Sequence, residues 1–525
     1  MRDSFRIAVD NIATFGDTDV FPFPIESHVF HDKPEEAVVL LETIHADFDN
    51  FFRRYPPVNE STLSLVSYTG FRWVTQIDPI WNAYLLGLVI SVADAIEAAR
   101  IAPQRQTIFS YRYSHDSVTS QIFQIGSWEL FLQRCSELSK QHGYVLACDI
   151  SDFYSRIYHH RLENALRNLG PGDTPSRIMT LLQRFSNNTS YGLPIGGPAA
   201  RLLSELLLNR TDHLLQTKGL IFCRYSDDYR VFANSVEDAY NAFRVLSEDL
   251  LRNEGLTLQK SKTRVMTAAE FQRSAELVED TLEEQQAHAF LRLSLKYDPY
   301  SPTAAEDYET LKAAVSQFDI TGMLSAELGK TRVHTALTRR LVQAIRFLPQ
   351  PARDAAVLTL VANLDHLAPV FSSVVRVVRD LFGELDSDSQ RRAVQHVRDL
   401  IASGTYLASI QLNIAYLLRV LAQDRNEENE ILTEAVFRDA SPFVQHDIIL
   451  IMAKWEAIYW TSDQKNYFAS MHPWLRRAFL IASYTLGDEG RHWRQSVRDE
   501  LSPFDLLVRD WASERFQLAN WSIPI

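Results

Sequence analysis

The stretch that decides the fold is RYSDDYR, residues 224–230. It lies between two short apolar runs, LIFC at residues 220–223 and VFA at residues 231–233, and this pattern predicts a β-hairpin with two adjacent acids at its tip. Adjacent carboxylates repel each other, and tight hairpin turns favour Asn-Gly or Asp-Gly instead. The alternative is an ordinary solvated acidic turn. Because a bound cation would stabilise both acids, Asp227 and Asp228 are candidate metal ligands.

A third acid follows another apolar run upstream. Residues 144–148, YVLAC, predict a strand that delivers Asp149 at its end, within CDISDFY at residues 148–154. A carboxylate at such a position can bind Mg²⁺, which prefers oxygen ligands and keeps part of its coordination for phosphates. Alone, Asp149 would be interpreted as a helix N-cap or a strand-end turn. Together the three acids fit two-metal phosphoryl transfer, with ions about 4 Å apart.

Length and charge limit the class of protein. A chain of 525 residues with 46% apolar and 23% charged residues predicts a globular protein of two or more domains. The net charge is −13, whereas proteins that coat long nucleic acids usually carry a basic excess. The charge is uneven: residues 1–50 hold three Lys/Arg against eleven Asp/Glu, and residues 100–201 hold eleven against seven. The locally basic part therefore surrounds the predicted acidic site.

The three cysteines and the apolar runs predict the compartment. Cys135, Cys148 and Cys223 form no CxxC pair, so we expect no zinc site or disulfide framework, and buried thiols in a reducing compartment. The sequence shows neither the apolar region of a signal peptide nor a run of about 18 apolar residues. We therefore expect a cytoplasmic protein that does not enter a membrane.

Two regimes divide the chain. Up to about residue 285, helical patterns mix with short β-rich runs, and beyond it helical periodicity dominates, as in Val374, Val377, Val378 and Leu381. The openings SPF, HPW and SPF place prolines at residues 442, 473 and 503, each in the favoured first position of a helix. A spacing of 31 and 30 residues predicts stacked helical pairs of the HEAT type. An irregular helical bundle is the alternative.

Four motifs then occur in a recognisable order: DISDFY at residues 149–154, GLPIGGP at 192–198, YSDD at 225–228 and LTLQKSKTR at 256–264. This order, within residues 95–265, resembles the palm of reverse transcriptases. The resemblance implies an α+β fold, with a fingers and palm domain over residues 1–285 and an all-α HEAT-like repeat domain over residues 286–525. It also implies a nucleotidyltransferase that takes dNTPs.

The resemblance assigns roles at the metal site. Asp149 and Asp227 are expected to ligate two Mg²⁺ ions, with Mn²⁺ as an alternative, and Asp228 to complete the site. The backbone carbonyl of Ile150 is expected to reach one of the ions. Lys262 matches the lysine that protonates or neutralises the leaving pyrophosphate, although an ordinary solvated lysine is nearly as good an interpretation.

The resemblance also assigns residues around the nucleotide. Tyr154 stands at the aromatic steric gate that excludes a 2′-hydroxyl, with a core aromatic as the alternative. Tyr225 and Ser226 are expected near the primer terminus. Arg105 and Arg112 are spaced like the two basic residues of the fingers that grip the triphosphate, a task that suits the guanidinium fork.

The sequence departs from templating enzymes in the GLPIGGP motif. Ile195 stands where many of them keep Gln, and an aliphatic side chain forms no hydrogen bond with the nascent pair. Gly196 still lets the backbone approach a nucleotide closely. No recognisable thumb follows Lys262, and the segment after it is acidic and helical. Template reading is therefore in doubt.

A palm followed directly by helical repeats resembles the abortive-infection reverse transcriptases of bacteria, the AbiK type. That resemblance implies phage defence by a bacterial or prophage-encoded cytoplasmic protein, homo-oligomers, and a phage protein as trigger. It further implies untemplated DNA synthesis primed on a protein hydroxyl, which leaves single-stranded DNA covalently attached through a Tyr. The sequence does not single out the primer among its 20 tyrosines, of which Tyr55 and Tyr68 precede the palm and Tyr406, Tyr416, Tyr459 and Tyr484 lie in the helical part.

Two other hypotheses remain open. One is an RNA-templated reverse transcriptase with a bound noncoding RNA, which should need a basic thumb or an RNA-binding appendage. The other is a non-enzymatic interaction scaffold, although such a relic would be expected to lose its metal ligands. All three acids are present.

Overall fold

The computed structural model describes residues 1–275, 286–287, 289–291, 293, 295 and 304–525. The chain forms two compact units that are not contiguous in sequence. Unit 1 comprises Met1–Ser61, Val74–Glu276 and Leu501–Trp511, and unit 2 comprises Thr62–Trp73, Leu277–Glu500 and Ala512–Ile525. The expected boundary at residue 285 falls at the edge of a range, 276–285, that lies outside the described residues.

Unit 1 mixes helices with two small sheets, as the patterns before residue 285 predict. Its elements are α1 (Arg2–Phe15), α2 (Ile25–Asp32), α3 (Pro34–Ala46), α4 (Phe48–Arg54), α5 (Pro79–Ile90), α6 (Ala93–Ala99), α7 (Ser127–Ser139), β3 (Tyr144–Asp149), α8 (Phe153–Arg156), α9 (His159–Arg167), α10 (Thr174–Phe185), α11 (Pro198–Thr217), β4 (Ile221–Tyr225), β5 (Asp228–Ala233), α12 (Val236–Asp249), β6 (Arg264–Thr267) and α13 (Ala268–Ala275). The hairpin of β1 (Asn59–Ser67) and β2 (Gly70–Ile77) has its base in unit 1 and its tip in unit 2.

Helix α5 is the centre of the helical part of unit 1. All twelve of its residues are buried, and it contacts α1, α2, α3, α10 and α11. Asp78 caps it by accepting a hydrogen bond from the backbone N–H of Ile80, ahead of Pro79 in the first helical turn. Among the described residues no single helix is long and apolar enough to cross a membrane. Helices α5 and α6, bent by 47°, reach that length and composition only as a pair.

The four-stranded sheet carries the site. Its strand order is β4-β5-β3-β6, and every neighbouring pair is antiparallel. The runs predicted at 144–148, 220–223 and 231–233 are confirmed, since they fall in β3, β5 and, apart from Leu220, β4, whereas β6 is an additional strand that the sequence patterns did not predict. Helix α12 contacts β3, β5 and β6, and α7 contacts β4 and β5.

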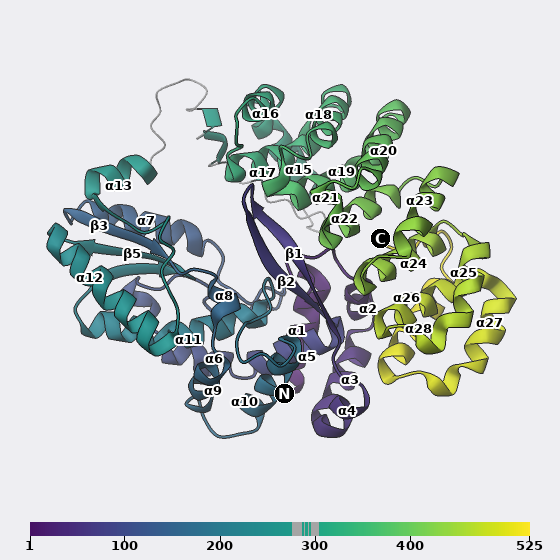
Figure 1. The fold of residues 1–525 in the computed structure, drawn as a ribbon, viewed down its shortest axis with the longest axis horizontal. Helices are drawn as coiled ribbons and strands as arrows, with labels where there is room; N and C mark the ends of the chain where they lie inside the picture. The colour runs from purple at the N-terminus through teal and green to yellow at the C-terminus, as the bar shows by residue number, and fades with distance from the viewer. Residues whose placement is uncertain (276–285, 288, 292, 294, 296–303) are drawn as a thin grey trace. The chain divides into compact units, whose positions relative to one another are not determined.

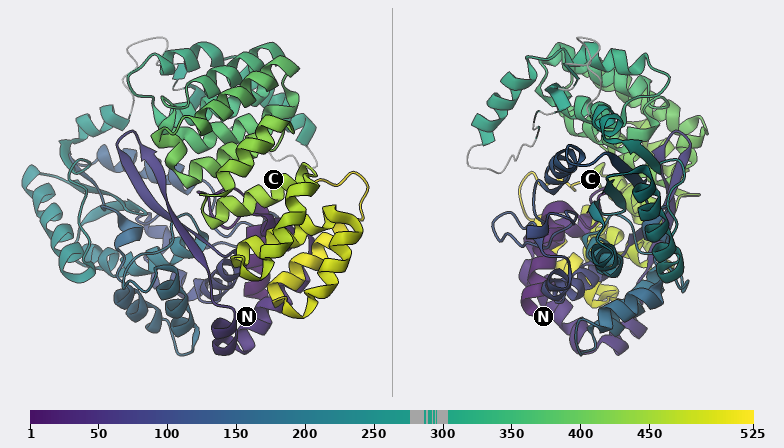
Figure 2. Two further views of the ribbon diagram at one scale, coloured as in Figure 1. Left: turned by 45° about the vertical axis from the view of Figure 1, so that its right-hand side comes forward. Right: turned by 90° about the vertical axis from the view of Figure 1, so that its left-hand side faces the viewer.

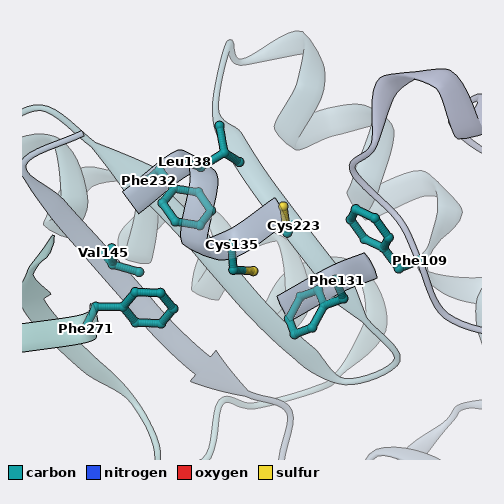
Figure 3. Close-up of a cluster of buried hydrophobic side chains, with 8 residues drawn as sticks. All are labelled: Phe109, Phe131, Cys135, Leu138, Val145, Cys223, Phe232 and Phe271. Atoms are coloured by element: carbon teal, nitrogen blue, oxygen red, sulfur yellow. The ribbon is translucent and has the colours of Figure 1, made fainter. Parts of the chain in front are cut away.

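A compact apolar cluster joins α7 to one face of this sheet (Figure 3). Its members are Phe109, Phe131, Cys135, Leu138, Val145, Cys223, Phe232 and Phe271. All three cysteines are buried and unpaired, as expected from their spacing. Burial of apolar side chains on this scale, at about 25 cal/mol per Å² of apolar surface, fixes the sheet that presents the acids.

Apart from the tip of the β1–β2 hairpin, unit 2 is helical, and no strand occurs among the described residues after 285. Its helices are α15 (Ala304–Val315), α16 (Ile320–Leu328), α17 (Thr335–Ala344), α18 (Gln350–Ala362), α19 (Phe371–Leu381), α20 (Ser387–Ala402), α21 (Tyr406–Ser409), α22 (Gln411–Leu421), α23 (Glu427–Phe437), α24 (Pro442–Lys454), α25 (Ile458–Gln464), α26 (Pro473–Ala482) and α27 (Gly487–Ser496). Helix α28 (Pro503–Arg515) is divided between the units.

The helices of unit 2 stack in two rows (Figures 1 and 2). In one row α17, α19, α22, α24 and α26 contact one another successively, and in the other α18, α20 and α23 do so. The predicted helix starts are confirmed, since α24, α26 and α28 begin at Pro442, Pro473 and Pro503. The predicted apolar face of α19 is buried. Helix α22 is buried at every residue after Gln411, as a helix packed between neighbours must be.

Candidate active site

The sheet brings the three predicted acids together. Asp149 is the last residue of β3 and lies directly opposite Asp228, the first residue of β5, in the antiparallel register. Asp227 lies in the two-residue turn between β4 and β5, and its carbonyl accepts a 3.1 Å hydrogen bond from the N–H of Ile150. Side chains directly opposite on antiparallel strands have Cβ atoms about 4.5–5.5 Å apart, and like charges there destabilise the sheet. The arrangement therefore calls for a cation.

Burial and mutual repulsion change the pKa values of these acids. Burial, followed by the charge of Asp149, raises the pKa of Asp227 to about 6. Burial also raises the pKa of Asp228, against the opposing effect of Arg230, whose guanidinium lies 3.3 Å from that carboxylate. Both shifts show that the folded chain stabilises the ionised acids poorly.

Lys262 supplies a positive charge to this cluster. Its Nζ donates a 2.7 Å hydrogen bond to Asp149, although the Lys262 side chain is 62% exposed. Burial alone would lower the pKa of Lys262, but the hydrogen bond and charge of Asp149 raise it overall. The loop before β6 thus brings the predicted lysine to the predicted acids.

The donor chemistry fits Mg²⁺, which prefers carboxylate oxygens. In the described part of the chain, no group of three His, Cys, Asp or Glu side chains is gathered into a ready-made metal cage. Asp149, Asp227 and Asp228 are nevertheless the residues that would hold the ions, since they are adjacent and partly buried, and Lys262 and Arg230 supply two positive charges against three carboxylates. Ile150, whose carbonyl is expected to assist, follows Asp149 in the chain and has a buried side chain.

A buried ionic cluster stabilises the turn between β4 and β5, and the sequence patterns did not predict it. Arg224, fully buried, donates to both oxygens of Asp212 at 2.9 and 2.6 Å and to both oxygens of Glu205 at 3.2 and 2.8 Å. It also donates to the carbonyl of Ser226 at 2.9 Å. All five guanidinium donors are used. Arg100 adds a second cation, 2.6 Å from Glu205.

This cluster had a sequence signal. Glu205 and Asp212 are seven residues apart on α11, which puts both acids on one helix face, and Arg224 immediately precedes the hairpin turn. Acids on an apolar helix face need a partner. The partner strand follows only a few residues later in the chain.

The aromatic residues surround the turn. The hydroxyl of Tyr154 is buried close to Ser204 and Ser226 without a well-formed hydrogen bond, and burial raises its pKa. The ring of Tyr225 packs against Trp128, Phe131 and Tyr111, with centroids 4.9–6.0 Å apart. Ser226 adopts a left-handed φ of 55°. The structure thus gathers Tyr154, Tyr225 and Ser226 beside the acids, while their roles toward a nucleotide stay predictions.

The GLPIGGP loop lies beneath an N-terminal segment. Gly196 has φ 100°, and a Cβ there would lie 2.4–2.9 Å from side-chain atoms of Thr18, Asp19 and Val20. Asp19 also donates its N–H to the carbonyl of Gly196 at 3.4 Å. Ile195 is buried and lines a small enclosed space together with Asp17. Glycine is therefore required at position 196 for close backbone approach.

The expected pair of phosphate-gripping arginines is not assembled. Arg112 is buried, and its guanidinium donates to Glu97 at 2.5 Å and to the carbonyls of Ile108 and Ile101 at 3.0 and 2.7 Å. These hydrogen bonds hold the Arg112 guanidinium inside the fold, so that it does not face a ligand. Arg105 is exposed. Spacing alone predicted the pair, and spacing does not reveal that Glu97 lies within reach of Arg112.

Comparison with known proteins agrees with this geometry. Residues 92–318 match the family model described as reverse transcriptase (RNA-dependent DNA polymerase). Residues 92–318 are therefore similar to a reverse transcriptase domain. It is 27% identical over 125 residues to the Retron Ec86 reverse transcriptase of Escherichia coli, a match over 23% of this chain and 38% of that enzyme's length.

Solved structures give weaker likenesses. Telomerase of Candida albicans, in complex with a fragment of telomeric RNA, aligns with 77% of this chain and 70% of its own at TM-score 0.30 and 10% identity. Apo telomerase of Candida tropicalis aligns with 80% of this chain and 73% of its own at TM-score 0.31 and 11% identity.

Proposed function

We propose that this protein is a DNA polymerase of the reverse-transcriptase type that acts in phage defence by abortive infection. The observation that carries the proposal is the pairing of Asp149 with Asp228 across the sheet, with Asp227 in the adjoining turn. Three like charges held this way have a physical reason when divalent cations bind there. Bound Mg²⁺ would activate the attacking hydroxyl and stabilise the leaving oxygen.

The chain's own residues would do the rest. Lys262, already at Asp149, is placed to give a proton or a positive charge to pyrophosphate as it leaves. The ring of Tyr154, whose hydroxyl lies near Ser204 and Ser226, would stand against the sugar and favour a dNTP. Arg224 fixes the carbonyl of Ser226 and so keeps the turn in place.

Untemplated synthesis is the finer part of the proposal. Ile195 offers no hydrogen bond to a base pair, and the loop around it is packed beneath residues 17–20. The two stacked rows of helices in unit 2 support an AbiK-type enzyme with a HEAT-like repeat domain. Homo-oligomers, a phage protein trigger and a bacterial cytoplasmic location belong to the same proposal.

Priming on a protein hydroxyl requires an accessible tyrosine. Tyr416 is buried, and the hydroxyl of Tyr68 donates to the carbonyl of His366 at 2.7 Å and accepts from the N–H of Val333 at 3.1 Å. Tyr406 and Tyr459 are 51% and 59% exposed. Tyr406 is the better candidate of these two, because the hydroxyl of Tyr459 already donates to Glu430 at 3.1 Å.

A second candidate function is a templated enzyme with a bound RNA, and the similarity to the retron enzyme favours it. One gel separates the two. Pure protein is incubated with radiolabelled dNTPs and Mg²⁺, with neither template nor primer, and resolved under denaturing conditions with and without protease. Label that migrates above the protein and is released by protease supports protein priming. Label that needs added RNA and primer supports the templated enzyme. Absence of label under every condition supports a scaffold or an enzyme that awaits a phage signal.

A further inference from the structure

An open groove of unit 1, outside the acidic cluster, combines positive charge with exposed aromatic rings. Its volume is about 500 Å³, within the range of ligand sites. Arg156, Arg161 and Arg252 line it together with Tyr158 and Tyr191. The Tyr158 and Tyr191 residues are 46% and 49% exposed and are neighbours in an isolated antiparallel bridge.

The charge of the groove is positive. Glu254 is the acid among the described residues that line it. Burial raises the pKa of Glu254, while the charge of Arg161 lowers it. Arg161 donates its Nε–H to the carbonyl of Asn253 and so joins two walls. Arg156 and Arg252 are exposed. In a chain of net charge −13, such a local excess of guanidinium groups selects an anion.

Two of the segments that line the groove are joined by backbone hydrogen bonds, and one of them follows Asp149 in the chain. The segment after Asp149 runs beside the segment that enters the GLPIGGP loop. Leu193 donates its N–H to the carbonyl of Tyr154 at 2.8 Å, and Gly192 donates to Ile157 at 2.8 Å. The bridge between Tyr158 and Tyr191 extends this pairing to the groove.

The third segment that lines the groove, residues 252–255, continues into residues that are hydrogen-bonded to the backbone at Asp149 and Ser151. It begins at Arg252 in the π-helical turn Leu250–Glu254. The chain then passes Thr257, whose carbonyl accepts from the N–H of Ser151 at 2.8 Å, and Gln259, which donates to the carbonyl of Asp149 at 2.7 Å. Backbone hydrogen bonds therefore connect the segments that line the groove to the strand end that carries Asp149.

We propose that this groove binds single-stranded nucleic acid, with phosphates on Arg156 and Arg252 and bases stacked on Tyr158 and Tyr191. A basic groove with aromatic platforms is the arrangement that recognises single strands without regard to sequence. The inference rests on the proposed polymerase function, because the strand would be one that enters or leaves the acidic site. Phosphodiester and base are common to DNA and RNA, and the test includes both.

The test measures binding apart from catalysis. Full-length protein is titrated, without dNTPs, into fluorescein-labelled twelve-nucleotide oligo-dT or oligo-rU while anisotropy is followed at several salt concentrations. The variants are Arg156→Gln with Arg252→Gln, and Tyr158→Leu with Tyr191→Leu. Arg391→Gln is the matched control, because Arg391 is an exposed arginine on α20 outside the groove and its partner, Asp388, contacts no groove residue in the described part of the chain.

We expect the double arginine variant to bind at least tenfold more weakly and to lower the salt slope by about 1.4, at about 0.7 per single-strand phosphate contact. Loss of the two rings should weaken binding by about 5- to 150-fold or more, the range for one stacked base. Arg391→Gln should change binding less than twofold. Thermal midpoints equal to the parent's would establish that the variants are folded.

Three results would overturn the inference: wild-type binding in both groove variants, an equal loss in Arg391→Gln, or competition by free dTTP as effective as competition by the oligonucleotide. Comparable binding of dT and rU identifies the shared chemistry as the ligand, and preference for one of them identifies the strand. Nucleotide incorporation is measured in parallel. If the groove variants keep both wild-type binding and wild-type incorporation, the groove proposal alone is refuted. If binding depends on the groove but the protein incorporates no nucleotide, the polymerase proposal alone is refuted.

Discussion

Replacing Arg224 by Met should destabilise unit 1 strongly, because the buried guanidinium satisfies two carboxylates at once. Glu205 would keep Arg100 at 2.6 Å and the hydroxyl of Ser110. Among the described residues, Asp212 would keep only the 3.5 Å hydrogen bond from the hydroxyl of Tyr229. The variant therefore leaves one nearly unpartnered buried carboxylate.

Removing one partner of a buried ion pair costs about 3–5 kcal/mol. For a unit of this size, each kcal/mol lowers the unfolding midpoint by about 2–4 °C. The expected decrease is therefore about 6–20 °C, in the calorimetric transition of the unit that contains the sheet. Met fills much of the same space, so lost packing contributes little.

Two further variants make the result specific. Arg224→Met combined with Asp212→Leu removes both charges and should recover at least half of the loss, since apolar replacements of a buried pair are often neutral. Arg244→Gln, at an exposed arginine on α12, should change the midpoint by less than about 2 °C. A midpoint for Arg224→Met within 2 °C of the wild type would refute the reasoning.

Three other perturbations test the site. Lys262→Met should lower nucleotide incorporation by about 10²–10⁴-fold, as expected of a general acid. It should change the free energy of unfolding by less than about 1 kcal/mol, because the lysine of the Lys262–Asp149 pair is largely exposed. A loss of activity that is accounted for by unfolding of the variant would contradict a role in chemistry. In metal-free protein, Asp227 should favour the folded state below about pH 4 and lose that contribution as pH rises through its folded pKa of about 6. The thermal midpoint of Asp227→Asn relative to that of wild type should therefore increase between pH 4 and 7. A difference in midpoint that does not change with pH would contradict this prediction. Gly196→Ala should lower the free energy of unfolding, measured in urea, by on the order of 1–3 kcal/mol. The reason is that residue 196 has φ 100° and that Oγ1 of Thr18 would lie 2.4 Å from the new Cβ. An unchanged free energy of unfolding would show that the N-terminal segment readily moves away.

Local pattern predicted the elements that present the acids. The strands around Asp149 and the hairpin around Asp227 follow from short apolar runs that flank polar residues, and this part was confirmed. The β1–β2 hairpin was missed, although Gly70 after a two-residue loop signalled it. The helix starts at the three prolines were predictable because proline at the first helical position acts locally.

Long-range pairing was not predictable in the same way. The use of Arg112 by Glu97, and the packing of residues 17–20 on Gly196, depend on segments that only the fold brings together. Charge spacing along the chain indicates which side chains are available. It does not indicate which of them another segment will bury.

The central claim is that Asp149, Asp227 and Asp228 together perform Mg²⁺-dependent nucleotide transfer. The most direct measurement compares dNTP incorporation by wild type with that of Asp149→Asn, Asp227→Asn and Asp228→Asn, each with its thermal midpoint. Asp152→Asn is the matched control: it removes an exposed carboxylate three residues from Asp149, at a left-handed φ of 48° that Asn tolerates. Each of the three variants should lose incorporation by a factor of roughly 10² or more without loss of stability, while Asp152→Asn keeps wild-type activity. Incorporation that survives in Asp227→Asn, or that is lost equally in Asp152→Asn, would contradict the claim.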